Sequence, residues 1–353
     1  MTQSTARRVI WPTDSNVRVR AVFLYVGQGS STLVLVRNGS TYNVWLVDIN
    51  LDSTCGGIDV PKLVKDLLSG DSLEAFVNTH PHDDHLKGIT ELEATVSINQ
   101  FLHSNHIPSQ KYGSRYDELK QVIKKVKEKG GTETILEGSR SSVAIGDAHY
   151  HVLAPAKHVT DDVNDETPET RRSRIHEQCG IIKFGDGIDW VMIVGDADKC
   201  AFKDHITVYH KERLPSFALA ASHHGSRTFF MENKGDEPYL DGLDAIDPTF
   251  VFVSAPTRKE SPHEHPHEDA MKLYGEHCGE SNVHHLGADR KSFIVDIYAS
   301  GGHSDVFDDN GDLAADYALA DSEGDDIASQ AKSFGPFVRP KTSTGDTVPR
   351  KYG

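Results

Sequence analysis

The stretch His80-Pro81-His82-Asp83-Asp84-His85 decides the fold of this chain. It follows Leu73–Asn78, an apolar run that predicts a buried strand ending just before His80. Imidazole and carboxylate groups are the side chains that bind Zn²⁺ and similar divalent cations in proteins. Five such residues in six positions, directly after a strand, therefore predict a loop folded around metal ions rather than a chance cluster.

Further candidate ligands follow apolar strands later in the chain. Asp196 comes after the strand WVMIVG, where its carboxylate can bridge two ions, although a turn aspartate is the alternative. His223 and His224 follow FALAAS in the same way, and spacing does not decide which imidazole binds metal and which faces a substrate. His176 lies twenty residues before Asp196 in RRSRIHEQCG, a polar segment that is also typical of a surface loop.

Periodicity predicts strands and helices in alternation. Paired strands are expected over 19–36 and 42–48, and a helix over 60–69 is expected to begin at an Asp59 cap. An amphipathic helix over 115–129 ends at Gly130-Gly131. A later helix near 267–277 accompanies strands near 181–184, 190–194, 217–221, 250–254, 283–286 and 292–298. This order of elements predicts a layered α/β domain.

Length and composition exclude several classes of protein. The chain has 353 residues, 37% of them hydrophobic, which is enough for one large core or two modest ones. No apolar run approaches the roughly 20 residues that span a bilayer, and the polar opening lacks a signal-peptide core, so we expect a cytoplasmic protein without membrane contact. The four cysteines, Cys55, Cys179, Cys200 and Cys278, form no CxxC pair, which predicts reduced thiols.

The charge is strongly negative and unevenly distributed. A net charge of −16 argues against indiscriminate coating of nucleic acid, because phosphate binding needs a positive surface. Residues 111–129 carry seven bases against three acids, which leaves room for a local phosphate-binding patch, although a solvated helix face is the simpler interpretation. Residues 301–330 carry nine acids and no Lys or Arg. We expect 300–353 to be an acidic, low-complexity tail that can bind a protein partner.

Several motifs, in order along the chain, resemble a known family. THPHDDHLKG matches the HxHxDH motif of the metallo-β-lactamase superfamily. The wider set YVGQGSS, LVDIN, VGDAD, SHHGS and HEHP resembles the hydrolase domain of ComEC-like competence proteins, over about residues 18–298. The resemblance implies an α/β fold, the αββα four-layer sandwich, in a domain 1–299 followed by the tail 300–353. Because the membrane channel of ComEC itself is absent, DNA import does not follow.

The resemblance also implies roles for individual residues. One metal ion would be held by His80, His82 and His176. The other would be held by Asp84, His85 and His223, with Asp196 as the bridge between them. Asp48 resembles the aspartate that braces the metal loop from behind. The residues closest to catalysis would be Asp84, His224 facing the substrate, and His265, which would protonate the leaving oxygen.

Two adjacent divalent ions determine the chemistry that we expect. They lower the pKa of a shared water, so that hydroxide can attack phosphorus or a carbonyl carbon near neutral pH. We therefore expect a hydrolase with two ions, Zn²⁺ or Mn²⁺, that acts as a phosphodiesterase or nuclease on short single-stranded nucleic acid or small cyclic nucleotides. Two alternatives stay open: hydrolysis of thioesters or lactones by the same hydroxide, and a metal-binding module that recruits a partner within a larger system.

Overall fold

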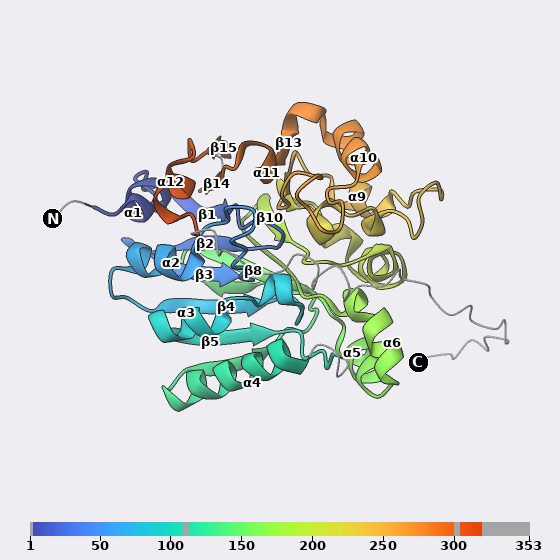
Figure 1. Ribbon diagram of the computed structural model, residues 1–353, viewed down its shortest axis with the longest axis horizontal. Helices are drawn as coiled ribbons and strands as arrows, with labels where there is room; N and C mark the ends of the chain where they lie inside the picture. Colours follow the sequence, from blue (N-terminus) through green and yellow to red (C-terminus); the bar gives the residue numbers. More distant parts are fainter. Residues whose placement is uncertain (1–2, 109–112, 300–303, 320–353) are drawn as a thin grey trace.

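Two β-sheets, packed face to face, form the centre of the molecule (Figure 1). The computed structural model describes residues 3–108, 113–299 and 304–319. In spatial order, the first sheet consists of β15 (Asp305–Asp308), β14 (Phe293–Tyr298), β1 (Val17–Phe23), β2 (Thr32–Asn38), β3 (Thr41–Val47), β4 (Leu73–Asn78), β5 (Ile98–His103) and β6 (Thr132–Ile135). The second consists of β13 (Val283–His285), β12 (Phe250–Val253), β11 (Ala218–Ala220), β10 (Asp189–Ile193), β9 (Ile181–Asp186), β8 (Ala148–Ala154) and β7 (Val143–Ile145).

Helices cover the outer face of each sheet. The first sheet shares an apolar core with α1 (Thr5–Ile10), α2 (Val60–Leu68), α3 (Ile89–Thr95), α4 (Gly113–Glu128) and α12 (Asp312–Tyr317). The second shares another with the segment of α7 (Lys199–Ala201) and η4 (Phe202–Ile206), with α9 (Asp241–Ile246) and with α10 (Glu268–Cys278). A third core fills the space between the sheets. The αββα four-layer sandwich expected from the sequence is thus confirmed.

Both faces of the central strands of each sheet are buried, which explains the apolar runs in the sequence. Successive side chains of a strand point to opposite faces. In β10, Val191 and Ile193 face the core between the sheets, whereas Met192 faces the core beneath the helices. A strand with two buried faces needs apolar residues at nearly every position, as WVMIV shows.

The parallel parts of the two sheets bring the candidate ligands to one edge. Strands β3 to β6 run parallel in the first sheet, and β10 to β13 run parallel in the second. Asp48 follows β3, His80 follows β4, Asp196 follows β10 and His223 follows β11. Ligand sites of open α/β sheets lie beyond the carboxyl ends of their strands. The polar residues at these strand ends therefore converge on a single site.

Most elements lie where periodicity places them. The expected strand Leu73–Asn78 is β4, and α2 begins after Asp59, whose carboxylate accepts the backbone N–H of Lys62 at 3.1 Å. The four cysteines are free thiols, as expected. Within the described ranges, no helix is long and apolar enough to cross a membrane.

The connection between β8 and β9 was not anticipated. It holds α5 (Lys157–Asn164), α6 (Pro168–Ser173) and the short turn η3 (Ile175–Gln178), which carries His176. Helices α5 and α6 lie together at one end of the molecule, beside the end of β5 in the view of Figure 1. The polar segment around His176 is therefore a short helical insertion rather than a surface loop, and the histidine that it carries is buried.

The expected tail begins later than residue 300. Residues 304–319 belong to the folded unit, because β15 pairs antiparallel with β14 and the side chains of Leu313 and Tyr317 are buried in the core under α1 and α2. The buried carboxylate of Asp309 accepts the backbone N–H groups of Ser292, Gly311 and Leu313. The segment is thus ordered by docking on an existing core rather than by its own apolar content. The remaining part of the expected tail, 320–353, lies outside the described residues.

Candidate metal centre

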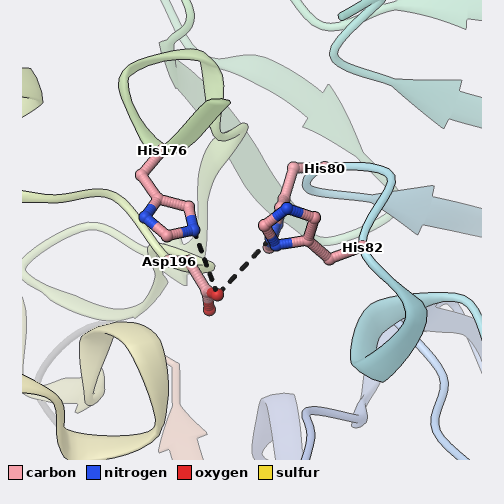
Figure 2. A group of neighbouring side chains, drawn as sticks. All are labelled: His80, His82, His176 and Asp196. Carbon is pink, nitrogen blue, oxygen red and sulfur yellow. Dashed lines mark hydrogen bonds and ion pairs between the residues drawn. The ribbon is translucent and has the colours of Figure 1, made fainter. Parts of the chain in front are cut away.

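Two groups of histidine and aspartate side chains meet at this edge of the sheets. The ligand atoms of the first group lie within 4.8 Å of one another and belong to four buried residues, His80, His82, His176 and Asp196. The second group, at the same spacing, consists of Asp84, His85 and His224. Figure 2 shows the first group: His80 and His82 leave the loop after β4, His176 approaches from the opposite side, and the Asp196 carboxylate lies below and between them.

The carboxylate of Asp196 faces both groups. Its Oδ2 atom lies 3.4 Å from Nε2 of His80 and 3.8 Å from Nε2 of His176. Its Oδ1 atom lies 3.0 Å from Nε2 of His85 and 3.7 Å from Nε2 of His224. One oxygen is thus directed to each group, which is the arrangement that a bridging carboxylate requires.

The donor atoms fit divalent metal ions. Among the described residues, both carboxylate oxygens of Asp196 and Nε2 of His85 are buried without a hydrogen-bond partner. Buried polar atoms are nearly always hydrogen-bonded, and leaving one unsatisfied costs about 1–3 kcal/mol. Imidazole nitrogens combined with carboxylate oxygens are the ligand set of zinc and other first-row cations. A metal ion in each group would satisfy these atoms.

Electrostatics at the centre also favour cations. Burial raises the pKa of Asp196, but the imidazoles of His223, His85 and their neighbours outweigh it and hold this pKa well below its usual range. Burial lowers the pKa of His85, whereas the carboxylates of Asp196 and Asp48 raise it, and the result lies well above the ordinary value. A cation that binds here therefore displaces a proton from His85. Burial, above all, lowers the pKa of His80, which keeps it neutral for metal binding.

Asp48 holds the metal loop from behind. Its carboxylate accepts the backbone N–H and the hydroxyl of Thr79 at 2.8 and 2.7 Å, and the side-chain amide of Asn78 at 3.2 Å. Nδ1 of His85 lies 2.7 Å from the same carboxylate. A hydrogen bond from Nδ1 fixes the ring and leaves Nε2 as the metal-binding atom. Asp48 therefore positions a ligand, which is the role that the resemblance implies.

The turn after β11 directs two neighbouring histidines at the centre. His223 and His224 have left-handed backbones, with φ of 49° and 55°, a conformation that costs non-glycine residues about 1–3 kcal/mol each. Nε2 of His224 lies 3.2 Å from Oδ2 of Asp84, whereas Nε2 of His223 lies 3.5 Å from Oδ2 of Asp196. Nδ1 of His224 lies 3.1 Å from the carbonyl oxygen of Ser254, to which it donates, so Nε2 is left for a metal. The structure therefore groups His224, rather than His223, with Asp84 and His85, and His223 lies beside the first group.

His265, the expected proton donor, lies beside His223 and His224. Its ring centroid is 5.2 Å from that of His223 and 6.2 Å from that of His224. Burial lowers the pKa of His265 well below its ordinary value, and the neighbouring His224 and His267 lower it further. The side chain is therefore a neutral imidazole near pH 7 and carries one ring N–H.

Over 113–129, the described part of the basic stretch, each lysine and the single arginine pairs with a carboxylate. Lys125 and Lys129 both pair with the buried carboxylate of Glu93, the former at 3.0 Å. Lys127 pairs with Glu133 at 2.8 Å. These pairs fasten α4 to α3 and β6. The simpler interpretation, an amphipathic helix with a solvated face, therefore fits the structure better than a phosphate-binding patch.

Some positioning residues were missed by reasoning from the sequence. Gly195 has a φ of 54°, and a Cβ there would lie 2.7 Å from the hydroxyl of Thr79, so only glycine lets the Asp196 turn approach the metal loop this closely. Its only sequence signal is the Gly-Asp pair in VGDAD. Ser254 carries no signal beyond its place after β12. Asp83, within the deciding stretch, instead lies 3.7 Å from Arg115 with its side chain 64% exposed.

Comparisons with known proteins give distant similarity. No protein-family model and no curated protein sequence matches the chain. Among solved structures, the chain is similar to a diphosphatase from the PhnP family, at 12% identity and a TM-score of 0.37, over 85% of this chain and 100% of that one. It is also similar to the metallo-β-lactamase SMB-1 bound to 2-mercaptoethanesulfonate, at 12% identity and a TM-score of 0.30, over 88% and 93% of the two chains. A third is MEM-A1, a subclass B3 metallo-β-lactamase from a soil metagenome library, at 14% identity and a TM-score of 0.28, over 74% and 86%.

Proposed function

We propose that this protein is a metallo-β-lactamase-superfamily hydrolase that uses two divalent metal ions to cleave phosphodiester bonds. The observation that carries the proposal is the Asp196 carboxylate, whose two oxygens face two separate ligand groups. His80, His82 and His176 would complete one site. Asp84, His85 and His224 would complete the other. The mixture of imidazole and carboxylate ligands suits Zn²⁺ or Mn²⁺.

Metal ions held by these ligands would make a water nucleophilic near neutral pH and would stabilise negative charge on the attacked group. The chain's own residues orient the rings of the ligands. Asp48 fixes His85 through Nδ1, and Ser254 fixes His224 in the same way. We assign His265, whose ring centroid lies 5.2 Å from that of His223 and 6.2 Å from that of His224, to the leaving oxygen. The ComEC-like motif set supports a phosphodiester as the bond that is cleaved.

The charges around the centre favour a small substrate. Three arginines near the ligands are already held by carboxylates: Arg115 by Glu118 at 2.7 Å, Arg174 by Glu177 at 2.9 Å and Arg227 by Asp269 at 2.8 Å. Paired arginines attract a polyanion weakly, and the net charge of −16 repels it. A short single strand or a small cyclic nucleotide therefore suits the site better than long duplex DNA.

A substrate panel tests the proposal. The protein, loaded with Zn²⁺ or Mn²⁺, would be incubated with bis-p-nitrophenyl phosphate, labelled single-stranded oligonucleotides, a cyclic dinucleotide, a lactone and an acyl thioester. We expect turnover of phosphodiesters that Asp196→Ala and Asp84→Ala abolish. Asp83→Ala is the matched control, because it changes an exposed carboxylate of the same loop, and it should retain activity.

Two outcomes would overturn the proposal. Turnover of the lactone or thioester with inert phosphodiesters would assign the same centre to carbonyl hydrolysis. No turnover of any substrate with either metal would leave a metal-binding module, and a partner that copurifies with the full chain but not with one lacking 320–353 would then point to recruitment as the function.

A further inference from the structure

A chain of buried hydrogen bonds connects the loop after β1 to His265. The hydroxyl oxygen of Ser261 accepts the backbone N–H of His263 at 3.2 Å and that of His265 at 3.0 Å. Its own proton is directed at Oε1 of Gln28, 2.8 Å away. Nε2 of Gln28 lies 3.5 Å from Nδ1 of His265. Gln28, Ser261 and His265 are each 8% exposed or less, so water competes little with these bonds.

The neighbouring bonds determine which group donates and which accepts in each of these hydrogen bonds. Both lone pairs of the Ser261 oxygen are engaged by backbone N–H groups, so its hydroxyl acts as a donor toward Gln28. The oxygen of the Gln28 amide must therefore face Ser261, and its NH₂ group must face His265. A donor that faces Nδ1 requires a lone pair on Nδ1, so the ring proton of His265 resides on Nε2.

The backbone around Gln28 holds its side chain in this place. Its N–H donates to Oδ2 of Asp52 at 3.0 Å, and its carbonyl oxygen accepts the side-chain amide of Asn50 at 2.7 Å. Gly29, the next residue, has a φ of 151°, and a Cβ there would lie 2.5 Å from that same amide nitrogen. The GQG turn is thus packed so closely on its surroundings that Gln28 has a fixed position.

We propose that Gln28 is a positioning residue that, together with Ser261, holds His265 as the neutral Nε2–H tautomer. His265 then serves the reaction as a hydrogen-bond donor to the substrate rather than as a proton donor. A neutral imidazole is a far weaker acid than an imidazolium, so in this role the ring donates a hydrogen bond from Nε2 and keeps its proton. This use of His265 rests on the proposed hydrolytic function, whereas the tautomer is a property of the protein alone.

The expected loss of kcat follows from the role of His265 as a hydrogen-bond donor. Removing one preorganised hydrogen-bond donor from developing negative charge lowers kcat by about 10²–10³-fold in enzymes where this has been measured. Gln28→Glu keeps the shape of the side chain but places an acceptor opposite Nδ1, which forces a proton onto Nδ1. The matched control is Gln100→Glu, the same change on β5, where Gln100 donates to Thr134 away from the centre.

Nitrogen NMR tests the tautomer directly. Long-range proton–nitrogen correlation spectra of the zinc-loaded, histidine-labelled protein would be recorded at pH 7.5, with His265→Gln used to assign the resonances. We expect His265 to show one protonated nitrogen, Nε2, and to gain a proton on Nδ1 in Gln28→Glu but not in Gln100→Glu. An Nδ1–H or doubly protonated ring in the wild-type protein, or a pattern unchanged by Gln28→Glu, would overturn the proposal.

Kinetics separates the donor role from the tautomer. With a phosphodiester, Gln28→Glu and His265→Gln should both lower kcat about 10²–10³-fold. The wild-type rate should not fall between pH 6 and 8, whereas a proton donor would lose activity as it deprotonates. Such a fall, or full activity of Gln28→Glu when its His265 ring carries a proton on Nδ1 alone, contradicts the donor role. If the wild-type protein cleaves no phosphodiester, the proposed function has failed, and the spectra still decide the tautomer.

Discussion

Replacement of Asp48 by asparagine tests how the chain prepares its second ligand group. The carboxylate of Asp48 is fully buried and lies 2.7 Å from Nδ1 of His85, with Thr79 and Asn78 as its other partners. Asp48→Asn keeps the volume but removes the charge and replaces one acceptor by an N–H donor. The ring of His85 then loses the partner that fixes Nε2 toward the metal.

The magnitude follows from the role of this bond. Loss of an outer partner of a metal-binding histidine lowers metal affinity about 10–100-fold, equivalent to about 1.4–2.7 kcal/mol. Because the only candidate ligand whose ring Asp48 contacts, among the described residues, is His85 of the second group, one of the two metal equivalents should weaken much more than the other. The loss should also be greater at pH 8 than at pH 6. At the lower pH, binding to the wild-type protein must first remove the proton that Asp196 and Asp48 stabilise on His85, and Asp48→Asn reduces that competition.

Competition with a chromophoric chelator, followed as two separate equivalents of Zn²⁺, measures the effect. Asp83→Asn is the control, since that carboxylate lies in the same loop but is largely exposed and should leave both equivalents unchanged. Equal affinity of Asp48→Asn and the wild-type protein for both equivalents at pH 8 would refute the reasoning. Equal weakening of the two equivalents would also refute it, because Asp48 holds the ring of His85 in the second group but only the neighbour Thr79 beside the first.

Further predictions concern the remaining parts of the structure. His224→Ala should lose one metal equivalent, whereas His223→Ala should keep two; the reverse result in elemental analysis would restore the assignment implied by the resemblance. Burial, with nearby cationic groups, lowers the pKa of His106 from 6.5 to about 3, so this neutral ring contributes stability above pH 6.5 that is lost as the pH falls toward 3. In urea unfolding, the wild-type protein should lose about 2 kcal/mol more of its free energy of unfolding between pH 7 and 5 than His106→Phe does. An equal loss in the two proteins would contradict the low pKa of His106. Leu313→Ala should lower the free energy of unfolding by about 2–5 kcal/mol, because Leu313 is fully buried, and a change below about 0.5 kcal/mol would show that α12 does not stabilise the body.

The strand-end ligands were predictable because sequence and topology act together there. An apolar strand followed at once by His80, or by Asp196, predicts a polar side chain at a sheet edge. Parallel pairing of β3 with β4, and of β10 with β11, then brings these ends together. The layered fold was predictable for a similar reason, since doubly buried strands leave apolar runs that are easily recognised.

What the sequence could not decide depends on backbone geometry and on long-range contacts. The grouping of His224, rather than His223, with Asp84 and His85 follows from two consecutive left-handed residues, a conformation that no periodicity reveals. The tie from Gln28 to His265 joins residues 237 positions apart. The segment 304–319 looked unable to fold because its few apolar residues are stabilised by a core built elsewhere in the chain. The charge of 111–129 was read without the acids, such as Glu93, that neutralise it from neighbouring elements.

Anomalous diffraction from crystals of the zinc-loaded protein tests the central claim most directly. The account predicts two anomalous peaks, one on each side of the Asp196 carboxylate. One peak would lie among His80, His82 and His176, and the other among Asp84, His85 and His224. A single peak, or two peaks that do not share Asp196, would contradict the two-metal centre.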